Sequence, residues 1–237
     1  MDLKFLYEAF LTIVPGVPLT LKLAGSSVAL GLFIALPLAL FRLSGVAALD
    51  WFARIYTFIF RSTPLLVQIF VIYYGLGQFR GIRTSVLWPI LRDPYWCAII
   101  ALTLNTAAYA SEIIRGGLVS VPAGQIEAAR AVGMSRLTAF RRIIVPQAIR
   151  QALPAYGNEL ILMVKATSLA SIITMLEVTG LAAKLISETY RAIEVFIVAG
   201  AIYLAINFIL TRALQFAEMR LSHHTRPHCE PVAGAAP

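Results

Sequence analysis

Five polar side chains interrupt long apolar stretches of this chain of 237 residues: Arg61, Asn105, Glu112, Lys165 and Ser168. Charged and amide groups are costly at membrane depth, and they usually face the interior of a helix bundle or a water-filled path. Each is therefore a candidate contact for a transported solute. The mixture of cations with a carboxylate suits a zwitterionic substrate, and it suits a proton relay nearly as well.

The spacing of these residues indicates how they relate to one another. Asn105 and Glu112 are seven residues apart, close to two helical turns, so they share one helix face. Arg61 and Glu112 are candidates either for a mutual ion pair or for contacts to the carboxylate and amino ends of a substrate, respectively. Each of two further residues also has a structural interpretation. The Lys165 side chain could extend to the membrane–water interface, and the Ser168 hydroxyl could serve helix packing.

The composition shows which elements must hold these side chains. Hydrophobic residues make up 59% and charged residues 14% of the chain, and the mean hydropathy is +0.79. A soluble protein cannot bury so much apolar surface, so we expect an all-α integral membrane protein whose transmembrane helices each take about 20 residues. The five expected transmembrane helices are residues 20–41, 55–76, 95–114, 156–178 and 195–216.

Breaks and charges near these spans carry further expectations. Val14–Pro18 reads as a break between a short amphipathic entry helix and the first span. Arg61–Pro64 interrupts the second span. Glu159 is expected close to the cytoplasmic interface, either solvated or paired with the basic segment that precedes it.

A basic segment, residues 115–150, separates the third and fourth spans and carries six arginines against one acid, Glu127. Because basic loops stay in the cytoplasm, this segment and the C-terminus are predicted to be cytoplasmic and the N-terminus periplasmic. The same rule accounts for the formal net charge of +8, so no nucleic-acid partner is expected.

The domain limits follow from these spans. Residues 1–217 are predicted to form one transmembrane domain, and residues 218–237 a polar, disordered cytoplasmic tail. No rigid element holds the metal-binding residue types of that tail, so no metal site is predicted there. Those residues are His223, His224, His228 and Cys229.

The basic segment is predicted to fold as two short helices that meet at a corner. The stretch from Ala123 to Phe140 is rich in alanine, and Gly133 breaks it. A second helix is expected from Arg136 onward, ending before Pro146. Such a compact pair of helices, called the knob below, would offer a contact surface to a partner subunit. The alternative is an ordinary amphipathic loop lying on anionic lipid.

Catalytic motifs are absent from the sequence. It contains no GxxxxGK[ST] phosphate loop, no GxSxG elbow and no HExxH zinc motif. These absences alone leave an intramembrane enzyme open, but no nucleophile–base pair can be named from the sequence. The chain is not expected to be an enzyme or to bind a cofactor, and the energy for transport would come from another chain. Two alternatives to a transporter driven by another chain stay open. One is a proton-coupled secondary transporter or channel, with Glu112 and Lys165 as the proton relay. The other is a purely structural membrane scaffold.

The basic segment also resembles the EAA loop of bacterial ABC importer membrane subunits. The matching residues share the characteristic spacing of that loop, and they are Glu127, Ala128, Ala129, Gly133, Ile143 and Pro146. One departure is Val145, which stands where the usual sequence has Leu.

Three other segments resemble the polar amino acid permeases within these importers. FRSTPLLVQIF, residues 60–70, is similar to their FRGTPLLVQ segment, with Ser62 in place of Gly. Residues 105–129 and 165–173 are similar to the same family. The resemblance extends from about residue 15 to 215 and looks most like the histidine and opine permeases of the octopine and nopaline type.

This resemblance implies a complete assembly. It implies the type I ABC importer permease fold in the bacterial inner membrane and the uptake of polar amino acids, in particular basic amino acids or opines. The implied partners are a homologous second permease subunit (a homodimer being the alternative to a heterodimer), two ATPase subunits that hold ATP and Mg²⁺, and a periplasmic substrate-binding protein. Glu127 would make a polar contact with the ATPase, and Gly133 would allow the tight corner.

Overall fold

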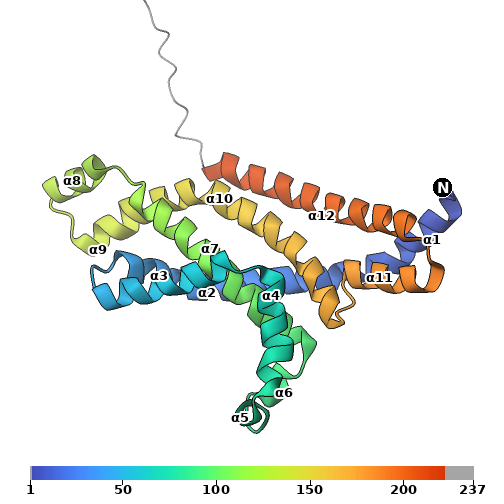
Figure 1. Cartoon of the computed structure of the whole chain (residues 1–237). Helices are drawn as coiled ribbons and strands as arrows, with labels where there is room; N and C mark the ends of the chain where they lie inside the picture. Colours follow the sequence, from blue (N-terminus) through green and yellow to red (C-terminus); the bar gives the residue numbers. More distant parts are fainter. Residues whose placement is uncertain (1, 222–237) are drawn as a thin grey trace, which may run out of the picture.

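Figure 1 shows the fold as a computed structural model that describes residues 2–221, and no β-strand occurs among those residues. Four long helices dominate it: α2 (Val17–Leu43), α7 (Pro94–Val119), α10 (Val145–Ala166) and α12 (Ala192–Leu221). Helix α7 packs against both α2 and α10, and α10 packs in turn against α12. The predicted all-α class is confirmed.

The N-terminal helix is joined to α2 by one tight turn. Helix α1 (Leu3–Ile13) leads into the 3₁₀ turn η1 (Val14–Gly16), and α2 follows at once. The prolines of the predicted break stand in the first turns of η1 and α2, where a missing N–H costs no hydrogen bond. The predicted break is therefore a short 3₁₀ turn, and the helical path runs on from Leu3 to Leu43.

The second apolar stretch is sharply bent. Helix α3 (Ala47–Ser62) ends before Pro64, and α4 (Leu65–Phe70), the π turn η2 (Val71–Gly75) and the 3₁₀ turn η3 (Leu76–Gln78) continue at an angle of 103° to it. Two short helices, α5 (Arg80–Arg83) and α6 (Trp88–Leu91), project beyond this arm and lead into α7 (Figure 1).

The basic segment forms the predicted knob at one end of the long helices (Figure 1). It consists of α8 (Ala123–Ala131) and α9 (Arg136–Ala139). The prediction that the second short helix ends before Pro146 is wrong, because the π turn η4 (Phe140–Ile144) carries the chain directly into α10. Pro146 stands in the first turn of α10, where a missing N–H is tolerated, and the wider π turn precedes it.

The fourth apolar stretch is also divided. Helix α10 ends at Ala166, the 3₁₀ segment η5 (Thr167–Ile173) extends it, and α11 (Val178–Thr189) follows after a bend of 45°. The helical path therefore starts well before the predicted residue 156. At the C-terminus α12 runs to Leu221, beyond the predicted domain limit of 217. The rest of the tail, with its three histidines and Cys229, lies outside the described residues, and so does the prediction that it is disordered.

Within residues 2–221, three helices are long and apolar enough to cross a membrane: Leu3–Leu43, Pro94–Val119 and Ala192–Arg220. Two more crossings are counted only if each bent helix pair, the one at Ser62 and the one after Ile173, is taken as a single span. The number of five spans stays a prediction.

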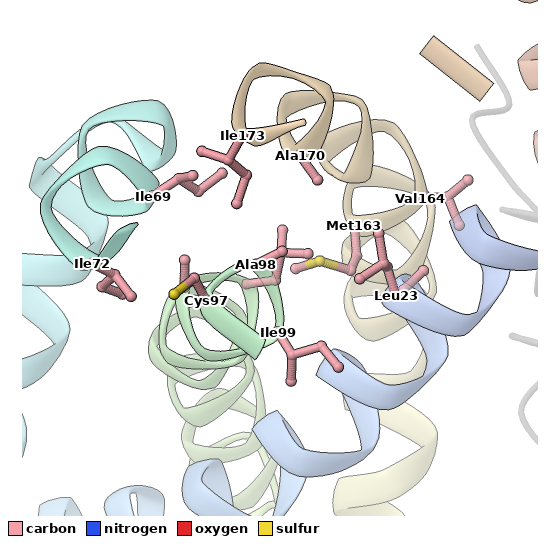
Figure 2. Close-up of a cluster of buried hydrophobic side chains, with 13 residues drawn as sticks. Leu23, Ile69, Ile72, Cys97, Ala98, Ile99, Met163, Val164, Ala170 and Ile173 are labelled. Carbon is pink, nitrogen blue, oxygen red and sulfur yellow. The ribbon is translucent and has the colours of Figure 1, made fainter. Parts of the chain in front are cut away.

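Small residues allow the central helix α7 to be enclosed by its neighbours. A Cβ atom on Gly31 of α2 would lie 2.3 Å from Thr106 Cγ2, and one on Gly117 of α7 would lie 2.6 Å from the carbonyl oxygen of Ala148 in α10. Lipid gives no hydrophobic drive for helix association, so close packing through such residues holds the helices together. Figure 2 shows one resulting core, in which Cys97 and Ala98 of α7 meet Leu23, Ile69 and Met163.

Candidate translocation site

Two clefts with polar linings open beside α7. The arginine cleft, of about 540 Å³, lies between α3, α7 and the end of α2, and it is lined by Arg42, Arg54, Thr57, Phe58, Arg61, Ser62, Tyr109 and Glu112. The lysine cleft, of about 430 Å³, lies between α7, α10 and η5, and it is lined by Asn105, Tyr109, Glu159, Leu162, Met163, Lys165, Ala166, Ser168 and Leu169. All five predicted pathway residues line one cleft or the other.

Tyr109 lines both clefts and stands between their cations. The Arg61 guanidinium lies over the Tyr109 ring, 5.2 Å from the ring centroid, in a cation–π contact. Asn105, Tyr109 and Glu112 follow at i, i+4 and i+7 on α7, so one face of this helix supplies the floor of both clefts. That spacing was a signal in the sequence for the role of Tyr109, which sequence reasoning missed.

The break in the second apolar stretch is closed by two amide side chains. The Gln68 Nε2 donates to the carbonyl oxygens of Phe60, at 2.9 Å, and Thr63, at 3.1 Å. The Asn105 Nδ2 donates to the Phe60 oxygen, at 3.2 Å, and to Gln68 Oε1, at 3.1 Å. These carbonyls lose their helical partners where α3 stops, and an unsatisfied carbonyl in hydrocarbon costs several kcal/mol. Asn105 therefore stabilises the break that places Arg61 in its cleft.

Glu112 is held by an ion network. Its Oε1 accepts from Arg42 Nη1 at 2.6 Å, and its Oε2 from Arg115 at 2.8 Å. Arg42 Nε also lies 2.9 Å from Asp50 Oδ1, at an angle that does not suit a hydrogen bond, and Asp50 accepts from Arg54 at 2.8 Å. The network ties the end of α2 to α3 and α7.

Of the two alternatives for Arg61 and Glu112, the mutual ion pair is not formed. Glu112 pairs with Arg42 instead. Both side chains are less than one fifth exposed, and a charge that is removed from water in this way needs an opposite charge beside it. The partner of Arg42 lies 70 residues away along the chain, so no local pattern in the sequence indicates this pairing. Arg61 is an exposed cation whose guanidinium lies over the Tyr109 ring.

The lysine cleft has a different balance of charge. Lys165 is exposed at the end of α10, and its carbonyl oxygen accepts from the Ser168 hydroxyl at 2.7 Å. Glu159 was expected to be solvated or paired with the basic segment, and this is wrong. Its side chain is only 6% exposed and accepts from the Thr106 hydroxyl of α7 at 2.9 Å. It is buried because α10 starts earlier than predicted, which places Glu159 deep in the α7–α10 contact.

The knob places the EAA-type residues at the far end of these helices. Glu127 and Ala128 are exposed on α8, while Ala129 is buried beneath them. Gly133 adopts a φ of +76°, a conformation that glycine takes without strain, and Met134 N donates back to Ala129 O at 3.0 Å to close the helix end.

On both sides of the corner, the knob presents apolar side chains to its surroundings. Val132 and Leu137 are 72% and 66% exposed. Ile143 is half-buried in η4, next to the start of α10, and Pro146 is exposed. An exposed apolar patch ringed by arginines is typical of a docking surface.

A helical membrane protein with broken helices around polar clefts and a separate knob at one helix end has the parts of a transport permease. Comparison with known proteins identifies the family: the chain belongs to the binding-protein-dependent transport system inner membrane components, whose family model matches residues 27–223. It is therefore the membrane permease subunit of an ABC importer, and ATP hydrolysis belongs to a separate subunit.

Individual relatives match almost the whole chain. The octopine transport system permease protein OccM of Rhizobium meliloti is 62% identical, over 98% of this chain and 94% of that protein. The nopaline transport system permease protein NocM of Agrobacterium fabrum is 56% identical, over 100% of this chain and 98% of that protein. A crystal structure of an amino acid ABC transporter with histidines superposes with a TM-score of 0.83 at 36% identity, over 93% of this chain and 99% of that one.

Proposed function

We propose that this permease carries opines, or the basic amino acids from which they are built, across the inner membrane along a path bordered by the arginine and lysine clefts. The observation that carries the proposal is the meeting of the two clefts at Tyr109, each with an exposed cation at its wall: Arg61 in one and Lys165 in the other. Similarity to octopine and nopaline permeases supports the same substrate class.

The charge arrangement fits a substrate with more than one carboxylate. An opine is an amino acid whose nitrogen carries a second carboxylate-bearing group. Arg61 and Lys165 match two such carboxylates through charge-assisted hydrogen bonds. Glu112 is less suited to a substrate amino group because two arginines already engage it. Glu159, which lines the lysine cleft, is the carboxylate that we assign to the basic end of the substrate.

Topology and partners complete the proposal. The excess of arginine in residues 115–150 supports a cytoplasmic knob and C-terminus with a periplasmic N-terminus. We infer a homologous second permease subunit, two ATPase subunits that hold ATP and Mg²⁺, and a periplasmic binding protein. The coupling residues are Glu127, Ala128, Ala129, Gly133, Ile143 and Pro146, and the ATPases would dock on their side of the knob.

The pathway proposal is tested by removing both free cations. Arg61→Gln with Lys165→Gln should lower kcat/KM for ATP-driven opine uptake by at least about 100-fold in proteoliposomes that hold the whole importer, since each lost charge-assisted bond is worth about 1.5–3 kcal/mol. Arg80→Gln, an exposed cation on α5 outside both clefts, should leave uptake unchanged. Unaltered kinetics in the double variant contradict the pathway, and uptake that follows a proton gradient without ATP would instead indicate a secondary transporter.

The coupling proposal is tested at the corner of the knob. Gly133→Val places a β-branched residue at a φ of +76°, which costs roughly 1–3 kcal/mol and should detach or uncouple the ATPase. Gly133→Asn is the matched control, because asparagine tolerates this conformation. Co-purification of the ATPase and ATP-driven uptake report the outcome. If the Val variant keeps both while it inserts normally, Gly133 has no part in docking.

A further inference from the structure

An apolar groove of about 420 Å³ lies between α2, α7, α10 and the π turn η4. Its walls include Leu36 and Leu40 of α2, Leu118 of α7, Phe140 of η4 and Ile149 of α10. Every side chain that lines it is a hydrocarbon. The groove lies on a different side of α7 from the two polar clefts and shares no lining residue with them.

The groove is held open by the packing of the helices that form it. The crossing of α7 and α10 beside it is set by Gly117, where a Cβ would lie 2.6 Å from the Ala148 carbonyl oxygen. These two helices are already in contact and cannot approach further. On α2 the lining extends from Leu32 to Leu40, eight residue steps that correspond to roughly 12 Å of helix. A narrow hydrocarbon slot of this length has the shape of part of an acyl chain.

Two exposed arginines adjoin one end of the groove. Arg141 and Arg142 directly follow the lining residue Phe140 on η4, and no ion pair involves them among the described residues. The sequence has no acid between residues 128 and 158, so nothing nearby along the chain neutralises them. In contrast, Arg42 and Arg115, at the adjacent ends of α2 and α7, are occupied by Glu112.

A second apolar groove provides an internal comparison. It lies between α2, α10 and α12 and has a similar size, about 450 Å³. The cations next to its lining residues have other contacts: Lys22 lies over the Tyr95 ring, Arg212 lies over the Phe208 ring, and Lys165 lines the lysine cleft. The groove beside η4 thus differs in having a pair of uncommitted cations at its end.

We propose that the groove beside η4 is a binding site for one anionic phospholipid, whose acyl chain lies along Leu36 and Ile149 and whose phosphate pairs with Arg141 and Arg142. The π turn that carries these arginines joins α9 of the knob to α10. A lipid bound there stabilises this junction. It therefore favours the transmission of movement from the ATPase, through the knob, to α10. The effect on coupling rests on the proposed function, while the binding site itself does not.

Binding is tested on the detergent-solubilised importer by native mass spectrometry with phosphatidylglycerol and phosphatidylcholine. The unaltered protein should retain phosphatidylglycerol about 30-fold better, as expected for two basic residues at a lipid headgroup. Arg141→Gln with Arg142→Gln should abolish this preference. Arg80→Gln with Arg92→Gln, two exposed cations outside the groove, should not. A double variant at 141 and 142 that keeps the full preference overturns the proposal.

The hydrocarbon part of the site is tested separately. Leu36→Trp fills the groove and should reduce phosphatidylglycerol binding at least tenfold. Phe33→Trp is the matched control, because Phe33 is 77% exposed on the same helix and does not line the groove. Equal binding by both variants overturns the proposal. So does efficient cross-linking of a cysteine at position 36 to the second permease subunit, which would show that a helix of that subunit fills the groove.

The consequence for coupling is measured last. ATP-driven uptake by the unaltered importer should be higher in vesicles that contain phosphatidylglycerol than in pure phosphatidylcholine, and the Arg141/Arg142 variant should lose that difference. Lipid binding without a difference in uptake removes the coupling role but keeps the site. Absence of uptake under every condition, with lipid binding intact, argues against the proposed function instead.

Discussion

Between residues 2 and 221, a helix is broken at two places within the apolar stretches, and the two breaks are built from opposite chemistry. After Ser62 the open end is a helix C-terminus, and the amide donors of Gln68 and Asn105 satisfy its carbonyls. Before Val178 the open end is a helix N-terminus, and a carboxylate satisfies its N–H groups. Glu177 accepts from Thr179 N at 2.9 Å and Gly180 N at 2.8 Å.

The surroundings of the breaks differ as much as their chemistry. The first break is exposed at Arg61 and Ser62 and opens on the arginine cleft. At the second break, Glu177 is fully buried, and the Tyr203 hydroxyl of α12 donates to it at 2.7 Å. An unwound segment that lines a cleft is free to meet a solute, whereas a buried one fixes the angle between helices. We therefore assign the first break to the transport path and the second to the framework.

The largest expected effect is at Gly180 in the second break. A Cβ there would lie 1.9 Å from the carbonyl oxygen of Met175, a distance that no side chain accommodates. Gly180→Val should prevent the importer from assembling, with a loss of more than about 4 kcal/mol of stability. Gly200→Val on α12, where a Cβ meets nothing within 4 Å, is the control. Yield and melting temperature of the purified complex give the answer, and normal assembly of the Gly180 variant would refute the framework role.

Removal of the Glu177 carboxylate should have the next largest effect. Glu177→Ala leaves two backbone N–H groups and the Tyr203 hydroxyl without their acceptor, at a cost of roughly 2–4 kcal/mol. Glu188→Ala, an exposed acid on the same helix, should cost almost nothing. The measurement is the melting temperature of the complex. Substrate KM should stay the same in the protein that folds, and a change in KM would move this break onto the transport path.

At the first break the expected loss of stability is smaller and the expected loss of transport larger. Gln68→Leu removes the donor to Phe60 and Thr63, which costs about 1–3 kcal/mol and loosens the position of Arg61. Combined with Asn105→Leu it should show a coupling energy of about 0.5–1.5 kcal/mol, because the two amides share a hydrogen bond. A Gln78→Leu control tests an exposed amide. Strictly additive losses, with unchanged uptake, would mean that the amides do not act together.

The smallest expected effect is a gain. Thr174, in the second break between Ile173 and Val178, adopts a φ of 67°, which a β-branched residue reaches only under strain. Thr174→Gly should stabilise the complex by up to about 1 kcal/mol. Thr179→Gly is the comparison, since Thr179 lies in α11 and should lose stability. A lower melting temperature for the Thr174 variant would show that the hydroxyl or methyl group has a role that the backbone does not reveal.

Local signals in the sequence predicted much of this arrangement. Arg61–Pro64 marked the first break, since proline cannot continue a helix without loss of a hydrogen bond. Gly133 marked the corner of the knob, and its positive φ supplies the physical reason. The seven-residue spacing put Asn105 and Glu112 on one face of α7, and both line clefts beside that helix.

The remaining features depend on contacts between distant parts of the chain. The pairing of Arg42 with Glu112 requires α2 to lie against α7, which no local pattern specifies. The burial of Glu159 follows from the early start of α10, and this start depends on the π turn that accommodates Pro146. The role of Glu177 as the cap of α11 depends on the fold of α11 and α12 around it, which no local pattern specifies.

The unbroken path from α9 through η4 and α10 to Ile173 has a mechanical consequence. It forms a rod of roughly 55 Å at about 1.5 Å per residue, with Pro154 inside α10, the knob at one end and the second break at the other. If such a rod pivots near its middle by about 10°, each end sweeps roughly 5 Å in opposite directions. Lys165 lies eight residues, about 12 Å, before the far end, so the same pivot moves its position by roughly 3 Å in the direction opposite to the knob.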